Sequence, residues 1–234
     1  MKNILADYHH PLVVKTAKEL TAGATTDREK LARLFYYVRD DIRFGFPLNG
    51  DFVKASETIQ LGHGQCNTKS TLFLALCKAL DIPARVHFSL IKKEIQSGLF
   101  TGFLYRMMPD EISHSWVEVS VDGRWARLDS FINDLAFYQN GKEILKRKGQ
   151  STGYSISCAE NSSADLNLNE ERFVQMASVT TDHGTWEEPA AYYATPQYKN
   201  RPSFMKNLVY RMTIGKINKR VVDIRSGCYS DLCG

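Results

Sequence analysis

The stretch TIQLGHGQCNTKSTLFLALCKALDIPARVHF, residues 58–88, joins a glycine-containing loop directly to an apolar segment, with Cys66 at the junction. After the cysteine, apolar residues recur at steps of three and four, which predicts a helix from about Cys66 to Leu80 that the sequence DIP ends. The expected buried face of this helix consists of Leu72, Phe73, Leu76 and Leu80. Cys66 could be a nucleophile, a metal ligand or a small residue that fits a helix start.

Two further helices are predicted upstream of the glycine loop. Apolar positions recur at helical spacing over residues 11–21 and 27–42, and Asp27 is the expected cap of the second helix. The segment FGFPLNGDF, residues 44–52, then breaks the pattern with Gly, Pro and Asn. It predicts a loop that continues through VKASETIQLGHG, residues 53–64.

The segment after Pro83 changes to a strand pattern. Three stretches are rich in β-branched and aromatic residues and predict strands: ARVHFSLI (84–91), SHSWVEVSV (113–121) and RWARLDSF (124–131). VDGR between the last two is typical of a tight turn, so we expect an antiparallel sheet packed on the cysteine helix. The connection over residues 91–112 is longer than most and is a candidate lid or substrate loop.

The last hundred residues carry weaker signals. Residues 149–169 are polar and predict a loop, and one or two helices are expected within 170–219. Neither an internal repeat nor a linker is visible. We therefore treat residues 1–234 as a single α+β domain, with a core at about 8–131 and an unassigned extension at about 135–234.

Three residues form a candidate catalytic group. At the amino end of a helix, unpaired N–H groups and the helix dipole favour a thiolate, so we expect the Cys66 pKa to fall below its ordinary value of roughly 8.5. A thiol nucleophile also needs a base and a group that orients the base. His114 opens one predicted strand and Asp129 closes the next, so a hairpin would place them roughly opposite each other.

GHGQCNTKSTLFLALCKALDIPARV followed by SHSWVEVSVDGRWARLDS resembles the transglutaminase-like core, a papain-related cysteine fold. The IPAR after the cysteine helix is typical of bacterial members, and residues 10–44 resemble the helical segment that precedes their core. The resemblance covers about residues 8–131. It implies a nucleophile helix packed on an antiparallel sheet, with extra N- and C-terminal helices, and it implies that Cys66, His114 and Asp129 are the catalytic triad.

The resemblance also has limits. Animal cross-linking enzymes of this superfamily usually carry Trp after the cysteine, where this chain has Asn67, and calcium dependence and protein cross-linking are not carried over. We expect acyl transfer through a Cys66 thioester, from an amide or thioester donor to water or an amine. The substrate would be a peptide, an amide or a carrier-bound acyl group. The alternative is a catalytically inactive binding module.

Two more site assignments are open. Papain-like enzymes place an oxyanion-hole glutamine six residues before the nucleophile, and Gln60 stands six residues before Cys66; the alternative is an exposed loop glutamine. A zinc set made of His63, Cys66, His114 and Asp129 is also conceivable. A catalytic thiol explains the same residues without a metal, so neither a metal nor a cofactor is expected.

Composition excludes several classes of protein. The net charge of +4 on 234 residues is mild, and the basic stretches lack interleaved aromatics, so no nucleic-acid partner is expected. The N-terminal sequence contains neither a signal peptide nor a membrane span, which indicates a cytoplasmic protein without membrane attachment. Oligomeric state is left open. Apart from Cys66, Cys77 is expected to be a buried hydrophobe, and no role is assigned to the remaining cysteines, Cys158, Cys228 and Cys233.

Overall fold

The centre of the structure, a computed structural model that describes residues 4–228, is an antiparallel sheet of four strands in the order β5-β4-β3-β8. The three predicted strands are confirmed as β3 (Ala84–Lys92), β4 (Glu111–Val121) and β5 (Arg124–Leu128). The fourth strand, β8 (Val179–Trp186), was not predicted. Its sequence VTTDHGTW is mostly polar and only partly buried, because β8 lies at an edge of the sheet.

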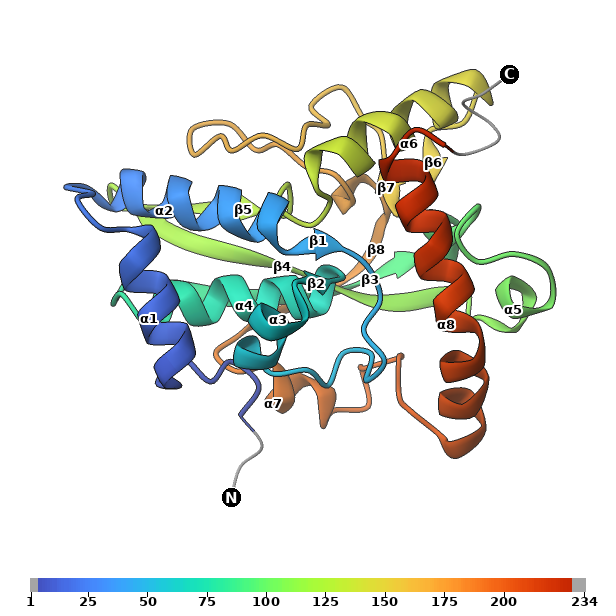
Figure 1. The fold of residues 1–234 in the computed structure, drawn as a ribbon, viewed down its shortest axis with the longest axis horizontal. Coiled ribbons are helices and arrows are strands. Elements are labelled where there is room, and N and C mark those ends of the chain that lie inside the picture. Colours follow the sequence, from blue (N-terminus) through green and yellow to red (C-terminus); the bar gives the residue numbers. More distant parts are fainter. Residues whose placement is uncertain (1–3, 229–234) are drawn as a thin grey trace.

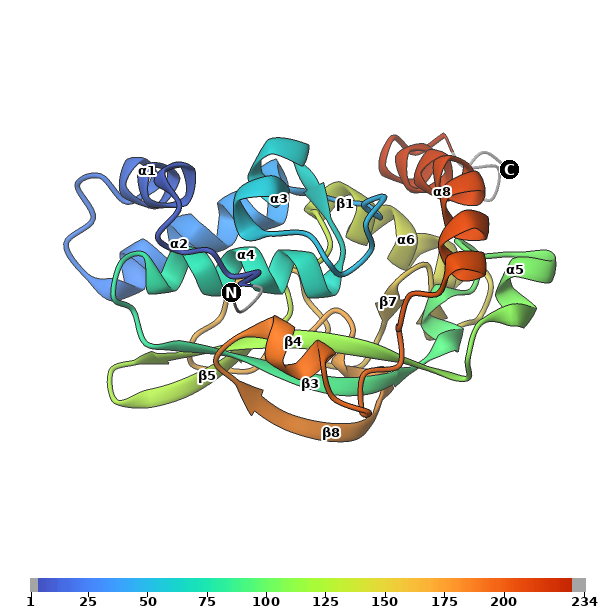
Figure 2. The same ribbon diagram turned by 90° about the horizontal axis from the view of Figure 1, so that it is seen from below.

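Helix α4 (Cys66–Lys78) packs on this sheet and confirms the predicted cysteine helix. Every residue from Asn67 to Cys77 is buried, so the expectation of a single buried face is too narrow. Figure 2 shows the reason: α4 lies between the sheet and a layer formed by α1 (Pro11–Leu20), α2 (Asp27–Tyr36) and α3 (Ala55–Leu61). Leu80 lies beyond the end of α4 and is half-buried.

The first two helices agree with the prediction except at their ends. The second predicted helix, 27–42, is α2 followed by a short π-helical turn, η1 (Tyr37–Asp41). Its cap is Thr26, whose side chain accepts a hydrogen bond from the Glu29 N–H, and Asp27 is the first helical residue instead of the cap. Thr and Asp are both good N-cap residues, which is why the pattern placed the cap one residue late.

The predicted loop between α2 and α4 contains ordered structure. Residues 55–61 form α3, which ends at Gly62 in the left-handed conformation with φ of 64°. Two short strands, β1 (Arg43–Phe44) and β2 (His63–Gly64), pair in parallel on either side of it. A helix of two turns is too short to give a clear periodic signal, so the loop prediction was wrong here.

The hairpin between β4 and β5 turns at Asp122 and Gly123, whose φ angles of 52° and 75° are those of a two-residue β-hairpin turn. The turn predicted from VDGR is confirmed. It fixes the register, in which Val117 of β4 lies opposite Leu128, the last residue of β5.

The remaining elements lie around the ends of the sheet. The candidate lid contains η2 (Lys93–Gln96) and α5 (Gly102–Met107). The extension holds α6 (Leu135–Arg147), β6 (Thr152–Gly153), β7 (Ile156–Ser157), η3 (Met176–Ser178), α7 (Pro189–Tyr193) and α8 (Phe204–Arg225). In Figure 1, α8 packs near α6 at the end of the molecule away from α1 and α2.

The pattern prediction for this second half is only partly right. The segment 149–169 is largely irregular, as expected; α7 lies within the predicted helical region 170–219, whereas α8 begins there and continues past it to Arg225. Among the described residues 4–228, no helix combines the length and apolar character that crossing a membrane requires.

Candidate active site

Cys66 is the first residue of α4, directly after the helix cap Gln65. Its Sγ donates a hydrogen bond to Gln65 Oε1 at 2.9 Å. Burial of the thiol raises the pKa of Cys66 well above its ordinary value, and the nearby charge of Asp51 raises it further, whereas the N–H groups of Ser115 and Asn67 lower it. The expected fall in pKa is therefore wrong for this resting geometry, because burial outweighs the helix terminus.

The first turn of α4 abuts one edge of β4. Strand β5 pairs with β4 only from Val117 to Val121, so the backbone of residues 113–115 is not paired on that side. Asn67 Nδ2 donates to the carbonyl of Ser113 at 3.4 Å, and Ser70 Oγ donates to the carbonyl of Ser115 at 3.3 Å. These contacts place Cys66 beside the strand segment that carries His114.

His114 is fully buried in β4, in register with Ser89 of β3. Burial lowers the pKa of its imidazole to about 3, so the ring is neutral in the resting protein. Within the described part of the chain, neither Nδ1 nor Nε2 of this ring has a hydrogen-bond partner. A buried polar group without a partner typically costs about 1–3 kcal/mol, and such unfavourable positions concentrate at functional sites.

Asp129 follows the last residue of β5 and is fully buried. Its carboxylate accepts hydrogen bonds from the backbone N–H groups of Val174, Gln175 and Met176, at 2.8, 2.8 and 3.0 Å. Burial raises its pKa to about 7, although these three N–H groups act in the opposite direction. Asp129 therefore holds a segment of the C-terminal half against the sheet.

The hairpin register offsets His114 from Asp129. Continued by one residue past Leu128, it sets Asp129 opposite Trp116, two positions along β4 from His114. The two residues thus lie on neighbouring strands with a stagger. Among residues 4–228 no hydrogen bond joins Cys66, His114 and Asp129 to one another.

A second buried carboxylate reaches Cys66 through Gln65. The side-chain Nε2 of Gln65 donates to Asp51 Oδ1, and its Oε1 accepts from both Cys66 Sγ and the Asn67 N–H, at 2.9 and 3.0 Å. The sequence analysis missed both residues. Gln65 carried a usable signal, because it immediately precedes the cysteine at a helix start; Asp51, in a turn of the glycine- and proline-containing loop, carried none.

Comparison with known proteins identifies the superfamily of this fold. A family profile described as Transglutaminase-like superfamily matches residues 14–130, half of the chain. The chain belongs to the transglutaminase-like superfamily. The matched region contains α4, β3, β4 and β5, and therefore Cys66, His114 and Asp129.

Two solved structures resemble this superfamily member more remotely. A candidate cysteine protease from Cytophaga hutchinsonii has 17% identity and a TM-score of 0.48, with 83% of this chain and 46% of that chain covered. A candidate protease from Parabacteroides distasonis has 15% identity and a TM-score of 0.37, with 53% and 25% covered. This chain thus spans less than half the length of either protein, and no curated protein sequence matches it.

The structure does not bring Gln60 to the thiol. Gln60 is exposed on α3, and no hydrogen bond of its side chain occurs among residues 4–228. The amide that contacts Cys66 is that of Gln65.

Replacing Gln60 tests its predicted oxyanion role directly. Loss of an oxyanion donor typically costs on the order of 10² to 10³ in kcat, whereas an exposed side chain with no hydrogen bond among residues 4–228 should matter little. From the structure we expect Gln60→Ala to change kcat by less than about threefold, measured on any acyl donor that the protein turns over. A loss of about a hundredfold, with an unchanged melting temperature, would restore Gln60 to the site.

The zinc alternative finds no support in the described residues. No group of three or more His, Cys, Asp or Glu side chains in residues 4–228 is arranged to hold a metal ion. His63 directs its Nδ1 toward the carbonyl oxygen of Leu61 at 3.0 Å.

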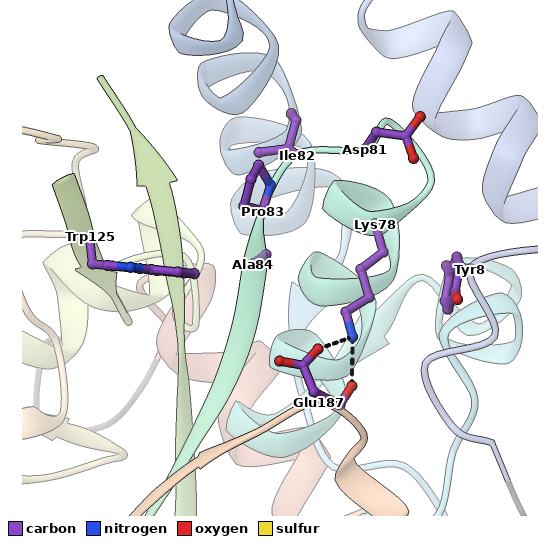
Figure 3. Close-up of a pocket in the computed structure, with 8 residues that line it drawn as sticks. All are labelled: Tyr8, Lys78, Asp81, Ile82, Pro83, Ala84, Trp125 and Glu187. Atoms are coloured by element: carbon purple, nitrogen blue, oxygen red, sulfur yellow. Dashed lines mark hydrogen bonds and ion pairs between the residues drawn. The ribbon is translucent and has the colours of Figure 1, made fainter. Parts of the chain in front are cut away.

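Two surface hollows lie away from Cys66. One, of about 420 Å³, is lined by Tyr8, Trp125 and the ion pair of Lys78 with Glu187, as Figure 3 shows. Lys78 ends α4, about 18 Å along the helix from Cys66 at a rise of about 1.5 Å per residue. The other, of about 470 Å³, lies beside α6 and is lined in part by Cys158.

The other cysteines differ in burial. Cys77 is fully buried, as expected, Cys158 is half-buried and Cys228 is exposed, all three as free thiols. Cys233 lies outside the described residues.

On β3, His87 joins the edge strand β8 to β4. Its Nδ1 lies 2.7 Å from Glu118 Oε1 and its Nε2 lies 2.6 Å from Asp182 Oδ1, while the ring stacks on Trp116. Burial lowers the pKa of His87, but hydrogen bonds to the two carboxylates and their charges outweigh burial and raise it above the ordinary value of 6.5. Protonated His87 therefore stabilises the folded state.

This pKa shift gives a pH-dependent stability. The folded-state pKa is raised, so the contribution is fully present below about pH 6.5, the unfolded-state value, and is lost as pH rises through the higher folded value. We expect His87→Gln to destabilise the protein more at pH 6 than at pH 9, as measured by urea unfolding. An equal loss of unfolding free energy at both pH values would mean that the ring contributes packing alone.

Proposed function

We propose that the protein catalyses acyl transfer through a thioester on Cys66, with His114 as the general base and Asp129 as the third member of the catalytic group. The observation that carries this proposal is the position of Cys66 at the start of α4, against the segment of β4 that holds His114, a buried, neutral imidazole whose nitrogens have no hydrogen-bond partner among residues 4–228. Membership of the transglutaminase-like superfamily supports the same assignment.

The proposed reaction begins with a neutral thiol and a neutral imidazole. When a donor carbonyl is bound, the Cys66 Sγ–H proton passes to a ring nitrogen of His114 as the sulfur attacks the carbonyl carbon. The tetrahedral intermediate collapses to a thioester, and the leaving amine or thiol takes the proton from the imidazolium. Water or an amine then attacks the thioester, again with His114 as base, and frees the Cys66 thiol.

Two backbone N–H groups beside the Cys66 sulfur suit the oxyanion, that of Asn67 at the start of α4 and that of Ser115 on β4. Amides at a helix N-terminus favour developing negative charge. The N–H groups of Ser115 and Asn67 already act on the Cys66 sulfur in the resting state. They could stabilise negative charge on sulfur or oxygen during attack.

Asp129 has a role compatible with both structure and catalysis. Its three backbone bonds hold residues 174–176 in place. Above its raised pKa of about 7, the buried carboxylate is ionised and would stabilise the imidazolium that forms on the neighbouring strand during proton transfer. We propose this electrostatic role in place of a direct hydrogen bond to His114.

The donor would be a peptide, an amide or a carrier-bound acyl group, and the acceptor either water or an amine. To distinguish the two acceptors, the protein is incubated with a panel of amide and thioester donors, with and without a primary amine. The products are then identified by mass spectrometry. Hydrolysis products alone indicate a hydrolase, and an amide product indicates an acyltransferase. Binding of a donor without any product, by a protein with a reactive Cys66, would favour the inactive binding module.

A further inference from the structure

The side chains of Cys66, Gln65 and Asp51 form one hydrogen-bonded chain. The thiol donates to Gln65 Oε1 at 2.9 Å, and Gln65 Nε2 donates to Asp51 Oδ1. Asp51 is itself buried, with 6% of its surface exposed. Its second oxygen accepts from Tyr198 OH at 2.7 Å and from Asn200 Nδ2 at 2.9 Å.

The neighbours of the Gln65 amide determine which way it faces. On one side, the Asn67 N–H lies 3.0 Å from the amide and requires an acceptor. On the other, the Asp51 carboxylate accepts hydrogen bonds and requires a donor. Both demands are met only when Oε1 faces the start of α4 and Nε2 faces Asp51.

This orientation favours one protonation state of the cysteine. A carbonyl oxygen 2.9 Å from sulfur accepts a hydrogen bond from a thiol, but it repels a thiolate, which has no proton to donate. We propose that Asp51 is a positioning residue that, through the amide of Gln65, holds Cys66 as a neutral thiol in the resting protein.

Among the charged groups near Cys66, Asp51 disfavours the thiolate most. The charge of Asp129 also disfavours the thiolate, after that of Asp51, and Tyr193 and His114 are buried neighbours that are neutral at pH 7. Lys69, on the same helix, does not pair with the sulfur, because its Nζ donates to the Arg39 carbonyl at 3.2 Å.

The catalytic consequence rests on the proposed function of Cys66. A thiolate that forms during attack cannot donate to Gln65 Oε1, so attack requires that the Gln65 amide turn its Nε2 toward sulfur or move away from it. Asn200 joins Asp51 to the strand that carries His114, because its Nδ2 donates to Asp51 Oδ2 at 2.9 Å and its Oδ1 accepts from the Ser113 N–H at 3.0 Å.

The test measures the thiol itself and needs no substrate. Alkylation of Cys66 by iodoacetamide is followed from pH 6 to 10.5 by mass spectrometry of the Cys66 peptide. We expect Asp51→Asn, which removes the charge but keeps the shape, to accelerate alkylation at pH 7 by about tenfold or more, because each unit of fall in pKa multiplies the thiolate fraction tenfold. The rate should also level off at a lower pH than in wild type.

Gln65→Asn is the second variant. Asparagine is a favoured helix cap, but its shorter side chain cannot span from Asp51 to the thiol, so we expect the same shift of the pH profile without loss of the helix. This variant decides the question if Asp51→Asn fails to fold.

Tyr198→Phe is the matched control, because it loosens the extension at Asp51 Oδ2 and leaves the bond of Oδ1 to Gln65. Its profile should keep the wild-type pH dependence within about twofold. A folded Asp51→Asn or Gln65→Asn with an unchanged or slower profile would overturn the inference, as would an equal acceleration in Tyr198→Phe. A shifted profile in a protein that lacks turnover would support the inference and count against the proposed function alone.

Discussion

Replacing Cys66 with alanine is expected to abolish acyl transfer while leaving the fold unchanged. The thiol donates one hydrogen bond, to Gln65, and a helix start accepts alanine at its first residue, so little stability should be lost. Removal of a nucleophile from a catalytic group can cost on the order of 10⁶ in kcat. We therefore expect a loss of at least about 10⁴-fold on any donor that the wild-type protein turns over.

Cys228→Ser is the matched control for this substitution. Cys228 is an exposed free thiol, so its loss should leave turnover within about twofold of wild type. Residual activity of Cys66→Ala above about a tenth of wild type, at equal melting temperature, would show that another group carries the chemistry.

Asp129→Asn is expected to lower the stability of the fold as well as the rate of acyl transfer. An amide has one acceptor oxygen, which can serve two of the N–H groups of residues 174–176, so its NH₂ would face the third N–H. A buried donor left facing a donor costs about 1–3 kcal/mol, and the lost charge-assisted bonds add to this. Urea unfolding at pH 7.5 should show a clear fall in the midpoint.

A triad aspartate that only oriented the imidazole would tolerate Asn in the fold. Asp122→Asn is the control, since Asp122 is exposed in a turn with positive φ that Asn tolerates. A wild-type unfolding midpoint in Asp129→Asn would show that the carboxylate does not anchor residues 174–176.

The cysteine helix and three of the four strands of the central sheet could be predicted from local sequence patterns. Helix α4 and strands β3, β4 and β5 follow from residue periodicity, and the hairpin register follows from the two residues of its turn. The edge strand β8 was missed because its side chains are exposed and its pairing with β3 spans about ninety residues of chain.

The candidate residues of the site could be named from the sequence, whereas their surroundings in the fold could not. Cys66, His114 and Asp129 lie in recognisable motifs, and the start of α4 at Cys66 was correctly predicted. The raised thiol pKa and the backbone bonds of Asp129 depend on burial and on segments far along the chain. Tyr198, for example, reaches Asp51 across 147 positions, and no local pattern contains that contact.

The most direct test of the central claim is intact-protein mass spectrometry of a quenched reaction with an activated acyl donor, followed by peptide mapping. The proposed function predicts a single acyl group on Cys66 that is removed by hydroxylamine, as a thioester is, and that does not form in His114→Ala at a comparable rate. Acylation of another residue, or an unmodified Cys66 while the donor is consumed at the wild-type rate, would contradict it.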